Sequence, residues 1–557
     1  MEKIGKVNLD YTYYKGKDLY SDGRIEDELL EACKNGTYEK LLYNSNQWPV
    51  LYHLSNIREN LLEWYPFSKD ADILEIGSGC GAITGILSKN AKTVTCIELS
   101  EKRSLINAYR HEECDNIKIM IGNFQDIEPH LEKYDYITLI GVWEYSGLYI
   151  NGNNPYLEML NIAKKHLKQN GRIIIAIENK MGLKYWNGAI EDHTGQLYSG
   201  LNDYVGDGSE SVRTFSKVEI EELFKKADLD KYVFYYPMPD YKLPDVIYSE
   251  KVLPMPGMER NYGKDYNATR IYNYNDAIVT DQICADKMFS YFANSFLIVI
   301  GEDKEQICYA KYNRCRKEEF RIKTEVVPQN DSIIVKKSAL NDTAGIHILN
   351  IKENEEICKS SLKSIQYVQG NVEENTYITQ FVSGIDLETL FYEYRNNIKE
   401  FIKNFKHFIN IIFRGNEMEL VDFAVSEEFI NIFGTCKPAN KKCLKSTNVD
   451  LIFSNMKLMP SGDIYCFDYE WVFDFLIPYE YMIWRMAHYL YEKYRAYLMW
   501  DISKAEFFNQ VGISKDDSDV YESMEKHFLA YVYGEYRKED YVKNYRKSAL
   551  IQITKIR

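Results

Sequence analysis

Two acidic residues flank a loop of alternating glycines in the first fifth of the chain. Glu75 precedes Gly77-Ser78-Gly79-Cys80-Gly81, and Glu98 follows the loop by about 20 residues. Glycines suit such a loop because a Cβ would obstruct both the sharp turn and the approach of a ligand to the backbone. An acid at that distance accepts hydrogen bonds from the two ribose hydroxyls of a nucleotide. The spacing therefore predicts a nucleotide-binding site.

The segments around this loop have the pattern of a βαβ unit. Apolar runs predict strands at Ile73–Ile76 and Thr93–Ile97, and the run Ala82–Lys89 between them predicts a helix. Strands and helices then alternate as far as Tyr248, which is the pattern of a doubly wound α/β sheet. The further strands are expected at Ile117–Ile121, Tyr136–Ile140, Arg172–Ile177 and Tyr232–Tyr236.

Polar and aromatic residues follow several of these predicted strands. In a doubly wound sheet, ligands bind beyond the carboxyl ends of the strands, so the residues at those ends are candidates for ligand contacts. They are Glu98, Asn123, Phe124, Glu144 and Glu178. The long segment after Glu178, which includes His193, is expected to be a substrate loop. Asp192 and His193 are too few to indicate a metal site by themselves.

Together these motifs resemble a class I S-adenosylmethionine-dependent methyltransferase over roughly residues 50–245. The resemblance implies that Glu75, Gly77, Ser78, Gly79 and Gly81 hold the methionine end of S-adenosylmethionine, that Glu98 holds its ribose, and that Asn123 and Phe124 lie at its adenine. A dinucleotide enzyme is the alternative, because Gly77–Ala82 also fits the pattern GxGxxA. Glu75 favours the methyltransferase, since a carboxylate there would attract a zwitterionic methionine but repel a pyrophosphate.

The methyl acceptor is not defined by the sequence. A hydroxyl acceptor needs a general base, whereas an amine needs only its neutral form. The candidate catalytic residues are His53, Glu144, Glu178 and His193; His53 belongs to a helix expected at Tyr52–Leu62, just before the first strand. We expect a small-molecule or glycan acceptor and leave open whether oxygen or nitrogen is methylated.

A second group of polar residues, Asp450, Asn455 and Asp468, lies toward the other end of the chain. One carboxylate can orient or deprotonate a hydroxyl, while an amide and a second carboxylate can hold Mg²⁺ against nucleotide phosphates. Successive antiparallel strands and a helix are predicted before this group. They fall at Phe296–Gly301, Gln306–Tyr312, Glu319–Val327 and Ser332–Lys336, with the helix at Ala344–Lys359.

Over roughly residues 285–500 this half resembles the protein-kinase-like fold of small-molecule phosphotransferases, the aminoglycoside and choline kinase group. The resemblance implies a catalytic Asp450, metal ligands Asn455 and Asp468, and an ATP-binding pair Lys336 and Glu353, with Lys311 and Glu356 as alternatives. The sequence departs from that family in three places: Asn448 stands where histidine is usual, the loop Gly301–Lys304 is not glycine-rich, and Gln380 stands where an acid is common. An inactive kinase-like recognition module is therefore the alternative.

Composition limits the classes of protein that this chain can belong to. With 557 residues the chain exceeds a single hydrophobic core. A net charge of -15 argues against nucleic-acid partners. The 11 cysteines contain no CxxC pair, which indicates reduced cytoplasmic thiols. No apolar run is long enough for a transmembrane segment, and the basic tail Ala549–Arg557 suggests at most a peripheral membrane contact.

The whole chain is thus expected to be an α/β methyltransferase domain followed by an α+β kinase-like domain with two lobes. The predicted units are a helical cap at 1–64, the methyltransferase domain at 65–250, a linker at 251–280, the kinase-like N-lobe at 281–395 and the helical C-lobe at 396–557. This order resembles bacterial proteins that phosphorylate and methylate the end of a surface polysaccharide. A methyltransferase with an inactive second half and a non-catalytic binding protein are the alternatives, and the oligomeric state is not predicted.

Overall fold

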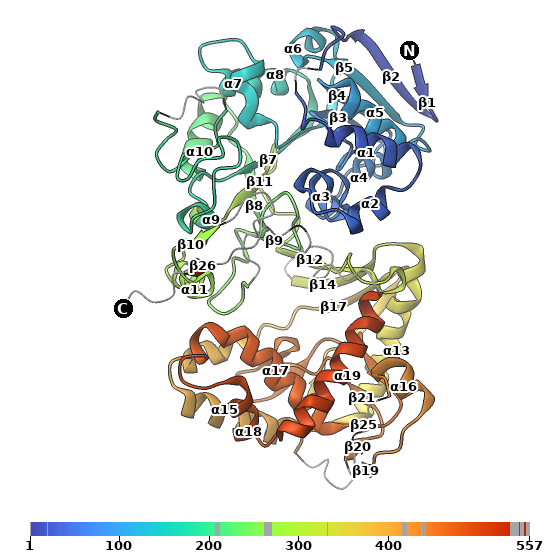
Figure 1. The fold of residues 1–557 in the computed structure, drawn as a ribbon, viewed down its shortest axis with the longest axis vertical. Coiled ribbons are helices and arrows are strands. Elements are labelled where there is room, and N and C mark those ends of the chain that lie inside the picture. Colours follow the sequence, from blue (N-terminus) through green and yellow to red (C-terminus); the bar gives the residue numbers. More distant parts are fainter. Residues whose placement is uncertain are drawn as a thin grey trace.

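One long sheet runs through the computed structural model, which describes residues 2–18, 20–206, 212–260, 270–330, 332–414, 420–435, 438, 441–534, 545 and 551–552. The sheet has 15 strands in the order β1-β2-β5-β4-β3-β6-β7-β11-β8-β9-β12-β13-β14-β17-β16. In Figure 1 it passes from the upper part of the molecule, which holds the N-terminus, toward the lower part.

The first half of this sheet is parallel and doubly wound. From β2 to β7 every pairing is parallel, and the strand order reverses at β3, which lies between β4 and β6. The strands are β1 (Glu2–Ile4), β2 (Val7–Tyr13), β3 (Asp72–Ile76), β4 (Thr93–Glu98), β5 (Ile117–Gly122), β6 (Tyr134–Ile140), β7 (Leu167–Glu178) and β8 (Tyr232–Met238). The predicted α/β sheet is therefore confirmed, whereas β1 and β2 were not predicted.

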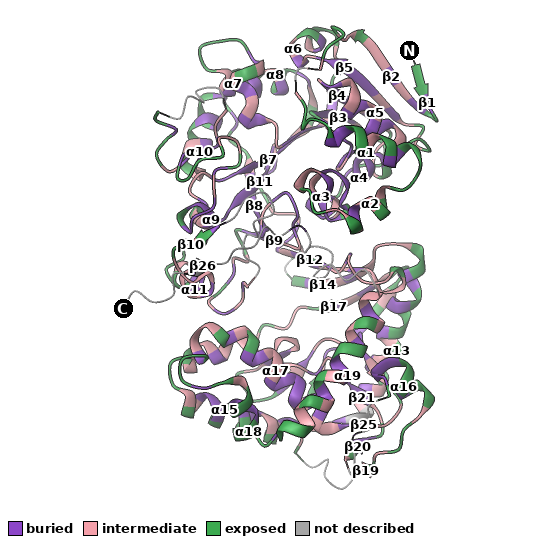
Figure 2. Ribbon diagram, in the orientation of Figure 1, coloured by how far each residue is buried: buried purple, intermediate pink, exposed green. Residues whose placement is uncertain are grey.

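Helices cover both faces of this part of the sheet, because successive strand residues point to opposite sides. Ile173, Ile175 and Ile177 of β7 pack in a core with α8 and α10, whereas Ile174 and Ala176 join the core under α4 and α5. The helices are α1 (Ile25–Lys34), α2 (Tyr38–Asn44), α3 (Trp48–Leu54), η1 (Asn56–Leu61), α4 (Thr84–Lys89), α5 (Glu101–Arg110), α6 (Phe124–Ile127), η2 (Glu128–His130), η3 (Trp143–Tyr145), α7 (Ser146–Tyr149), α8 (Pro155–Lys165), α9 (Leu183–Trp186) and α10 (Lys217–Lys226). Figure 2 shows the buried strands between these partly exposed helices.

Strand β11 (Ser295–Ile300) lies in the first half of the sheet although it comes late in the sequence. It pairs antiparallel with β7 on one side and with β8 on the other. This contradicts the prediction that Phe296–Gly301 begins a separate second unit. The physical reason is that all six residues of β11 are buried, so the strand needs a cover on both faces that only the centre of a large sheet provides.

The sheet continues without a break into the second half. Strand β9 (Val246–Ser249) pairs with β8 and also with β12 (Tyr309–Tyr312). The strands β13 (Ile322–Gln329), β14 (Ser332–Ala339), β17 (Thr376–Gln380) and β16 (Gly370–Glu373) then follow in antiparallel pairs. The predicted linker at 251–280 contains β10 (Ile271–Tyr272) and the start of α11 (Asp276–Ala285), and its residues 261–269 lie outside the described part.

Most of the remaining helices and short strands surround a core of the C-terminal half, whereas Phe289 packs in the core of the N-terminal sheet. The helices are α12 (Phe289–Phe292), η4 (Glu318–Phe320), η5 (Asp342–Ala344), α13 (Gly345–Ser361), α14 (Leu387–Leu390), η6 (Phe391–Tyr394), α15 (Ile398–Ile412), α16 (Glu427–Phe433), η8 (Phe453–Asn455), α17 (Tyr479–Leu498), α18 (Lys504–Gln510) and α19 (Lys515–Tyr533). The strands are β15 (Gln366–Tyr367), β18 (Ile385–Asp386), β19 (Val421–Asp422), β20 (Lys442–Leu444), β21 (Thr447–Asn448), β22 (Met456–Leu458), β23 (Ile464–Cys466), β24 (Val472–Phe473), β25 (Ile477–Pro478) and β26 (Ile551–Gln552). The kinase-like fold of this half stays a prediction.

Within the described residues, no helix is long and apolar enough to cross a membrane. The tail Ala549–Arg557, for which a peripheral membrane contact was predicted, lies outside the described residues except for Ile551 and Gln552. The membrane contact therefore stays a prediction.

Candidate active site

A cavity of about 530 Å³ opens beyond the carboxyl ends of β3 and β6, where the strand order reverses. The glycine loop after β3 and the end of β4 line one side of the cavity. The residues that follow β6, β7 and β8 line the other side, together with α3 from the N-terminal region. This is the position that the rule for ligands in doubly wound sheets predicts.

The loop after β3 can take its course only with glycines. Gly77 has a φ of +71°, and a Cβ there would lie 2.5 Å from Cγ2 of Val142. A Cβ on Gly81 would lie 2.3 Å from Oδ1 of Asn107. Gly79 also has a positive φ, of +53°, but no heavy atom lies within 4 Å of its Cβ position. The open side of Gly79 thus belongs to the wall of the cavity, which Ser78 also lines.

Glu75 and Glu98 are both buried next to this loop. Glu98 accepts hydrogen bonds from the backbone N–H of Gly79 at 2.7 Å and of Ser100 at 3.0 Å. Burial raises the pKa of Glu98, although Arg103 partly opposes the shift. Glu75 accepts a hydrogen bond from the hydroxyl of Thr84 at 2.6 Å, and burial raises its pKa to about 7. A cationic ligand group beside Glu75 would therefore favour its ionised form.

Asn123 and Phe124 lie where β5 ends and α6 begins, and both line the cavity. The side-chain oxygen of Asn123 accepts a hydrogen bond from the backbone N–H of Gln125 at 3.0 Å and caps α6. A glycine loop with an open face, a buried acid at the end of the second strand and an aromatic ring after the third strand fit S-adenosylmethionine. Seven of the eight residues predicted for this cofactor, from Glu75 to Phe124, line the cavity. The eighth, Gly81, packs against Asn107 behind it.

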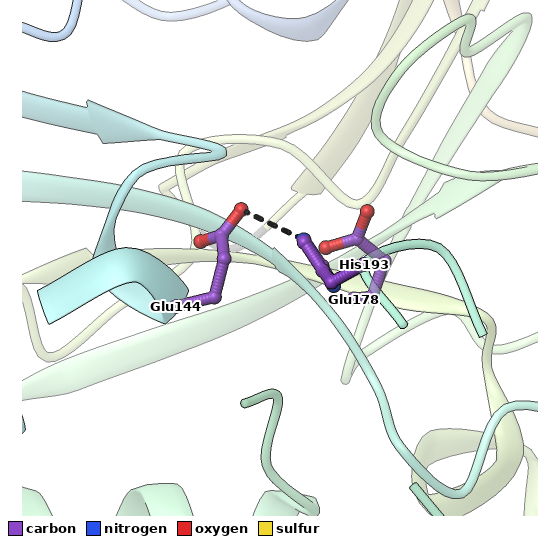
Figure 3. Close-up of side chains that lie close together, drawn as sticks. All are labelled: Glu144, Glu178 and His193. Carbon is purple, nitrogen blue, oxygen red and sulfur yellow. Dashed lines mark ion pairs between the residues drawn. The ribbon is translucent and has the colours of Figure 1, made fainter. Parts of the chain in front are cut away.

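Three of the predicted catalytic residues, Glu144, Glu178 and His193, converge on the opposite side of the cavity (Figure 3). Glu144 follows β6 in η3, Glu178 ends β7, and His193 lies in the loop predicted to bind substrate. Nε2 of His193 lies 3.7 Å from Oε1 of Glu144, and Nδ1 lies 2.9 Å from Oε1 of Glu191. Glu144 and Glu178 are 1% and 0% exposed. These three side chains thus meet at the cavity, and their catalytic role stays a prediction.

The ionisation of this cluster is strongly perturbed. Burial lowers the pKa of His193, but Glu144, Glu191 and Glu178 together raise it well above its ordinary value. Burial raises the pKa of Glu144, and the charge of Glu178 raises it further, while His193 lowers it. Buried acids and a histidine that shift one another's pKa are typical of functional sites.

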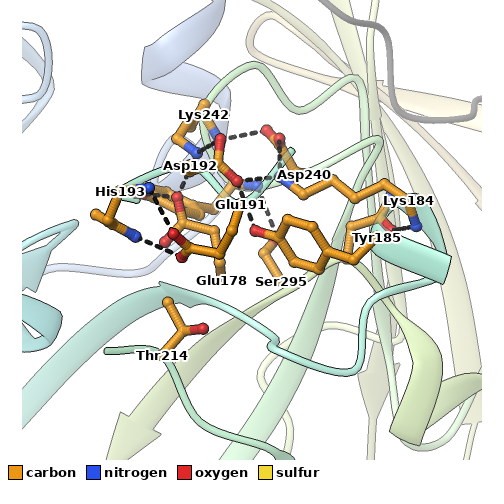
Figure 4. A network of polar contacts seen from close by, with 12 residues as sticks. Glu178, Lys184, Tyr185, Glu191, Asp192, His193, Thr214, Asp240, Lys242 and Ser295 are labelled. Carbon is orange, nitrogen blue, oxygen red and sulfur yellow. Dashed lines mark hydrogen bonds and ion pairs between the residues drawn. The ribbon is translucent and has the colours of Figure 1, made fainter. Parts of the chain in front are cut away.

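Two lysines that the sequence interpretation missed neutralise part of this acidic group (Figure 4). Lys242 forms ion pairs with Glu178 and, at 3.0 Å, with Asp192. Lys184 forms an ion pair with Asp192 at 2.8 Å. Lys242 follows β8, which runs parallel to β7 because both are antiparallel to β11. The predicted strand Tyr232–Tyr236 corresponds to β8. The rule that ligands lie beyond the carboxyl ends of strands could therefore have indicated Lys242.

His53, the fourth predicted catalytic residue, lines the same cavity from α3. Its Nε2 lies 2.7 Å from Oδ2 of Asp22, and Asp22 also accepts a hydrogen bond from Arg103 at 2.8 Å. Burial lowers the pKa of His53, although Asp22 opposes the shift. Burial therefore favours the neutral imidazole, and the contact with Asp22 orients its ring.

The second predicted group, Asp450, Asn455 and Asp468, also comes together. The amide nitrogen of Asn455 donates to the carbonyl oxygen of Asp450 at 2.9 Å, and that of Asn448 donates to the carbonyl oxygen of Asp468 at 2.8 Å. Burial raises the pKa of Asp450 to about 7, with a further contribution from the charge of Asp468. The roles of these residues in ATP and Mg²⁺ binding stay predictions.

Lys336 and Glu353 do not belong to this group, which corrects the prediction. The buried lysine of β14 is Lys337, which forms ion pairs with Asp468 at 2.5 Å and with Glu470 at 2.8 Å. Lys336 points to the other face of the sheet, because neighbouring residues of a strand alternate in direction. Glu353 is exposed on α13, whose buried acid is Glu355.

Comparisons with known proteins agree with the first site. The methyltransferase domain family matches residues 51–232. The ribosomal RNA small subunit methyltransferase A of Syntrophus aciditrophicus (strain SB) is 28% identical over 101 residues, which are 18% of this chain and 34% of that protein. The protein of the same name from Borreliella afzelii (strain PKo) is 30% identical over 105 residues, or 19% of this chain and 37% of that protein. The chain thus spans about a third of the length of these curated relatives.

Among solved structures, an S-adenosylmethionine-dependent methyltransferase from Archaeoglobus fulgidus aligns with 44% of this chain and 94% of its own, at 11% identity and a TM-score of 0.28. The domain match at 51–232 covers β3 to β7 and the residues of the cavity that lie between them. The N-terminal part of the chain therefore contains a methyltransferase domain.

Proposed function

We propose that this protein transfers a methyl group from S-adenosylmethionine to an oxygen or nitrogen atom of a small-molecule or glycan acceptor in the cytoplasm. One observation carries the proposal: a single cavity joins the open face of Gly79 and the carboxylate of Glu98 to Glu144, Glu178 and His193. A cofactor held at the glycine loop and an acceptor held at the acidic cluster would meet within it. Proximity of this kind supplies much of the rate of methyl transfer.

Each side of the cavity has a distinct task in this proposal. When bound, S-adenosylmethionine would supply a methyl group on a positively charged sulfur. The acceptor would bond to the methyl carbon as the carbon–sulfur bond breaks, and the electron pair of that bond would stay on sulfur. Glu98 would hold the ribose by accepting hydrogen bonds from its hydroxyls, and Glu75 would hold the ammonium group of the methionine end. His53 takes the proton of the acceptor, since its Nε2 hydrogen is donated to Asp22 and its Nδ1 lone pair remains available.

The character of the acceptor follows from the charge of the chain. A net charge of -15 does not suit a polyanion such as the ribosomal RNA named for the curated relatives. Lysines, acids and tyrosines line the cavity, among them Lys184, Asp192 and Tyr145, and they favour an acceptor with several hydroxyl or amino groups, as in a sugar.

Isothermal titration calorimetry with S-adenosylhomocysteine tests cofactor binding, and transfer of labelled methyl to a panel of glycans and small molecules tests the reaction. Gly77→Ala should abolish binding because its Cβ would lie 2.5 Å from Val142. Gly152→Ala is the matched control, since Gly152 also has a positive φ but no heavy atom within 4 Å of its Cβ position. Absence of binding to the wild-type protein would overturn the proposal.

We further propose that the C-terminal half transfers phosphate from Mg-ATP to the same acceptor, as an enzyme of bacterial surface polysaccharide synthesis would. Its support is the meeting of Asp450, Asn455 and Asp468 beside Lys337, which takes the place first assigned to Lys336. Mg-ATP should then raise the thermal unfolding midpoint, and Asp468→Asn should remove that shift. No shift with the wild-type protein, with methyl transfer intact in the variant, would favour an inactive recognition module.

A further inference from the structure

The side chains of Glu144, Glu178 and His193 each direct one possible metal ligand toward the others, and these three atoms lie within 4.8 Å of one another (Figure 3). We propose that they form a binding site for a divalent first-row metal cation that positions the methyl acceptor. The inference rests on the proposed methyl transfer, because the cation would hold the acceptor in the same cavity. Sequence spacing could not predict this group, because Glu144, Glu178 and His193 come from three separate segments that only the fold brings together.

The histidine is held as a metal-binding histidine would be. Nδ1 of His193 lies 2.9 Å from Oε1 of Glu191, so a hydrogen on Nδ1 leaves the lone pair on Nε2. Glu191 is itself fixed, because its other oxygen accepts hydrogen bonds from the backbone N–H of His193 at 2.8 Å and of Thr194 at 2.7 Å. A carboxylate that fixes the far nitrogen of a histidine is the usual support of a metal ligand.

Both carboxylates keep one oxygen without a partner. Oε2 of Glu144 and Oε2 of Glu178 are buried and make no hydrogen bond with any described residue. Oε1 of Glu178 is already engaged by Lys242 and by the hydroxyl of Tyr241, so only Oε2 is available. A buried carboxylate oxygen without a partner is costly, and a bound cation would remove that cost.

The charge of the surrounding network favours a dication over a neutral ligand (Figure 4). Carboxylates outnumber ammonium groups among the described residues of this network. Lys184 and Lys242 pair with Glu178, Asp192 and Asp240, and Glu144 and Glu191 pair with His193. Five carboxylates thus face two ammonium groups and one imidazole, so the cluster carries excess negative charge whether His193 is neutral or protonated. A divalent cation between Glu144 and Glu178 would offset it.

The donor set indicates the class of metal. Two carboxylate oxygens and one imidazole nitrogen suit Mn²⁺, Fe²⁺, Co²⁺ or Zn²⁺ better than Ca²⁺ or Mg²⁺, which prefer oxygen ligands alone. Three protein ligands leave further coordination positions open, as in catalytic metal sites. Because all three residues line the cavity, the open positions are available to oxygen atoms of an acceptor.

Metal binding can be measured without the methyl-transfer reaction. The full chain is stripped with a chelator, titrated with Mn²⁺ and followed by electron paramagnetic resonance, with Zn²⁺ as a competitor. We expect one saturable ion per chain, and at least about a tenfold loss of affinity in Glu144→Gln and in His193→Asn. Glu128→Gln is the matched control: Glu128 also contacts a histidine, His166 at 2.6 Å, but lies outside the cavity, so its variant should bind Mn²⁺ as the wild type does.

Circular dichroism verifies that each variant is folded. Failure of both ions to bind the wild type, or equal affinity in wild type, Glu144→Gln and His193→Asn, would overturn the inference. The inference would also be overturned if the stripped protein bound ethanolamine but neither Mn²⁺ nor Zn²⁺. The cluster would then be a site for an amine acceptor. S-adenosylhomocysteine is titrated into the same samples. If it binds and the metal ions do not, the metal site is refuted and the proposed methyl transfer stands. If the metal ions bind and it does not, the proposed methyl transfer is refuted.

Discussion

Two clusters of buried acids in this chain differ in how their charges are compensated. In the N-terminal cavity, Glu144 and Glu178 each keep a carboxylate oxygen without a hydrogen-bond partner among the described residues. In the C-terminal half, the acids are paired with cations of the chain itself: Lys337 with Asp468 and Glu470, Arg316 with Glu470, and Arg485 with Asp450 at 3.5 Å.

This difference separates carboxylate oxygens that have no partner in the described chain from carboxylates that the chain pairs with its own cations. Unpaired buried carboxylates lower stability and persist where a ligand compensates them. Paired carboxylates contribute to the native structure, and a ligand must displace their partners before it can bind. Mg-ATP would have to compete with Lys337 for Asp468, whereas a ligand of the N-terminal cavity meets free oxygens.

The largest expected effect is the loss of a cation from the C-terminal cluster. Lys337→Met should lower the free energy of unfolding by about 3–5 kcal/mol, because it removes the cation shared by the partly buried Asp468 and the buried Glu470 and leaves Arg316 to pair with Glu470. Lys336→Met, the neighbouring lysine on the other face of β14, should change it by less than about 0.5 kcal/mol. Urea unfolding of the two variants measures both values, and equal effects would show that the C-terminal acids do not depend on Lys337.

The opposite pattern is expected in the N-terminal cluster. Glu144→Gln should reduce the rate of methyl transfer by about 100-fold or more while changing the free energy of unfolding by less than about 1 kcal/mol. The reason is that Oε2 of Glu144 has no partner to lose among the described residues, and glutamine keeps a side-chain oxygen to place beside His193. Steady-state kinetics and urea unfolding test it, with Glu128→Gln as the control. A large loss of stability in Glu144→Gln would remove the distinction between the two clusters.

A smaller effect concerns the cofactor side of the cavity. Burial raises the pKa of Glu75 to about 7, so in the ligand-free protein its ionised form is disfavoured, and the stability it contributes falls as pH rises from the ordinary carboxyl range through about 7. The ammonium group of the cofactor should restore the charge and release a proton. Affinity for S-adenosylhomocysteine should thus increase, by up to about tenfold, between about pH 6 and about pH 8.

Calorimetry in buffers with different heats of ionisation counts that proton. Glu75→Gln should remove both the proton release and the increase in affinity. Proton uptake on binding, or an affinity that falls over this pH range, would show that Glu75 does not face the ammonium group.

The smallest expected effect tests the corrected assignment on α13. Glu353→Ala should change the free energy of unfolding by less than about 0.5 kcal/mol, because Glu353 is exposed. Glu355→Ala should cost about 3 kcal/mol, since Glu355 is 0% exposed and accepts hydrogen bonds from the hydroxyl of Tyr377 at 2.7 Å and from the backbone of Gly370. Thermal unfolding of the two variants compares them, and a greater loss in Glu353→Ala would restore the original prediction.

The sequence was informative where local rules decide the structure. The course of the loop Gly77–Gly81 and the place of Glu98 at the end of β4 follow from backbone sterics and strand spacing, and both were predicted correctly. The choice between Lys336 and Lys337 was wrong because a shift of one residue reverses the face of a strand. The sequence alone contained no register for β14. The place of β11 between β7 and β8, and the meeting of Lys242 with Glu178, depend on contacts between distant segments.

The position of β11 has a practical consequence for dividing the protein into parts. A fragment that ended at residue 250 would lack the strand that separates β7 from β8, so the main-chain groups of both strands would be left unpaired along their facing edges. Unpaired apolar strand edges promote aggregation. A fragment meant to carry the methyltransferase domain alone therefore has to extend through Ile300. The sheet of that fragment would end at β9, whose outer edge pairs with β12 in the full chain and would be exposed in the fragment.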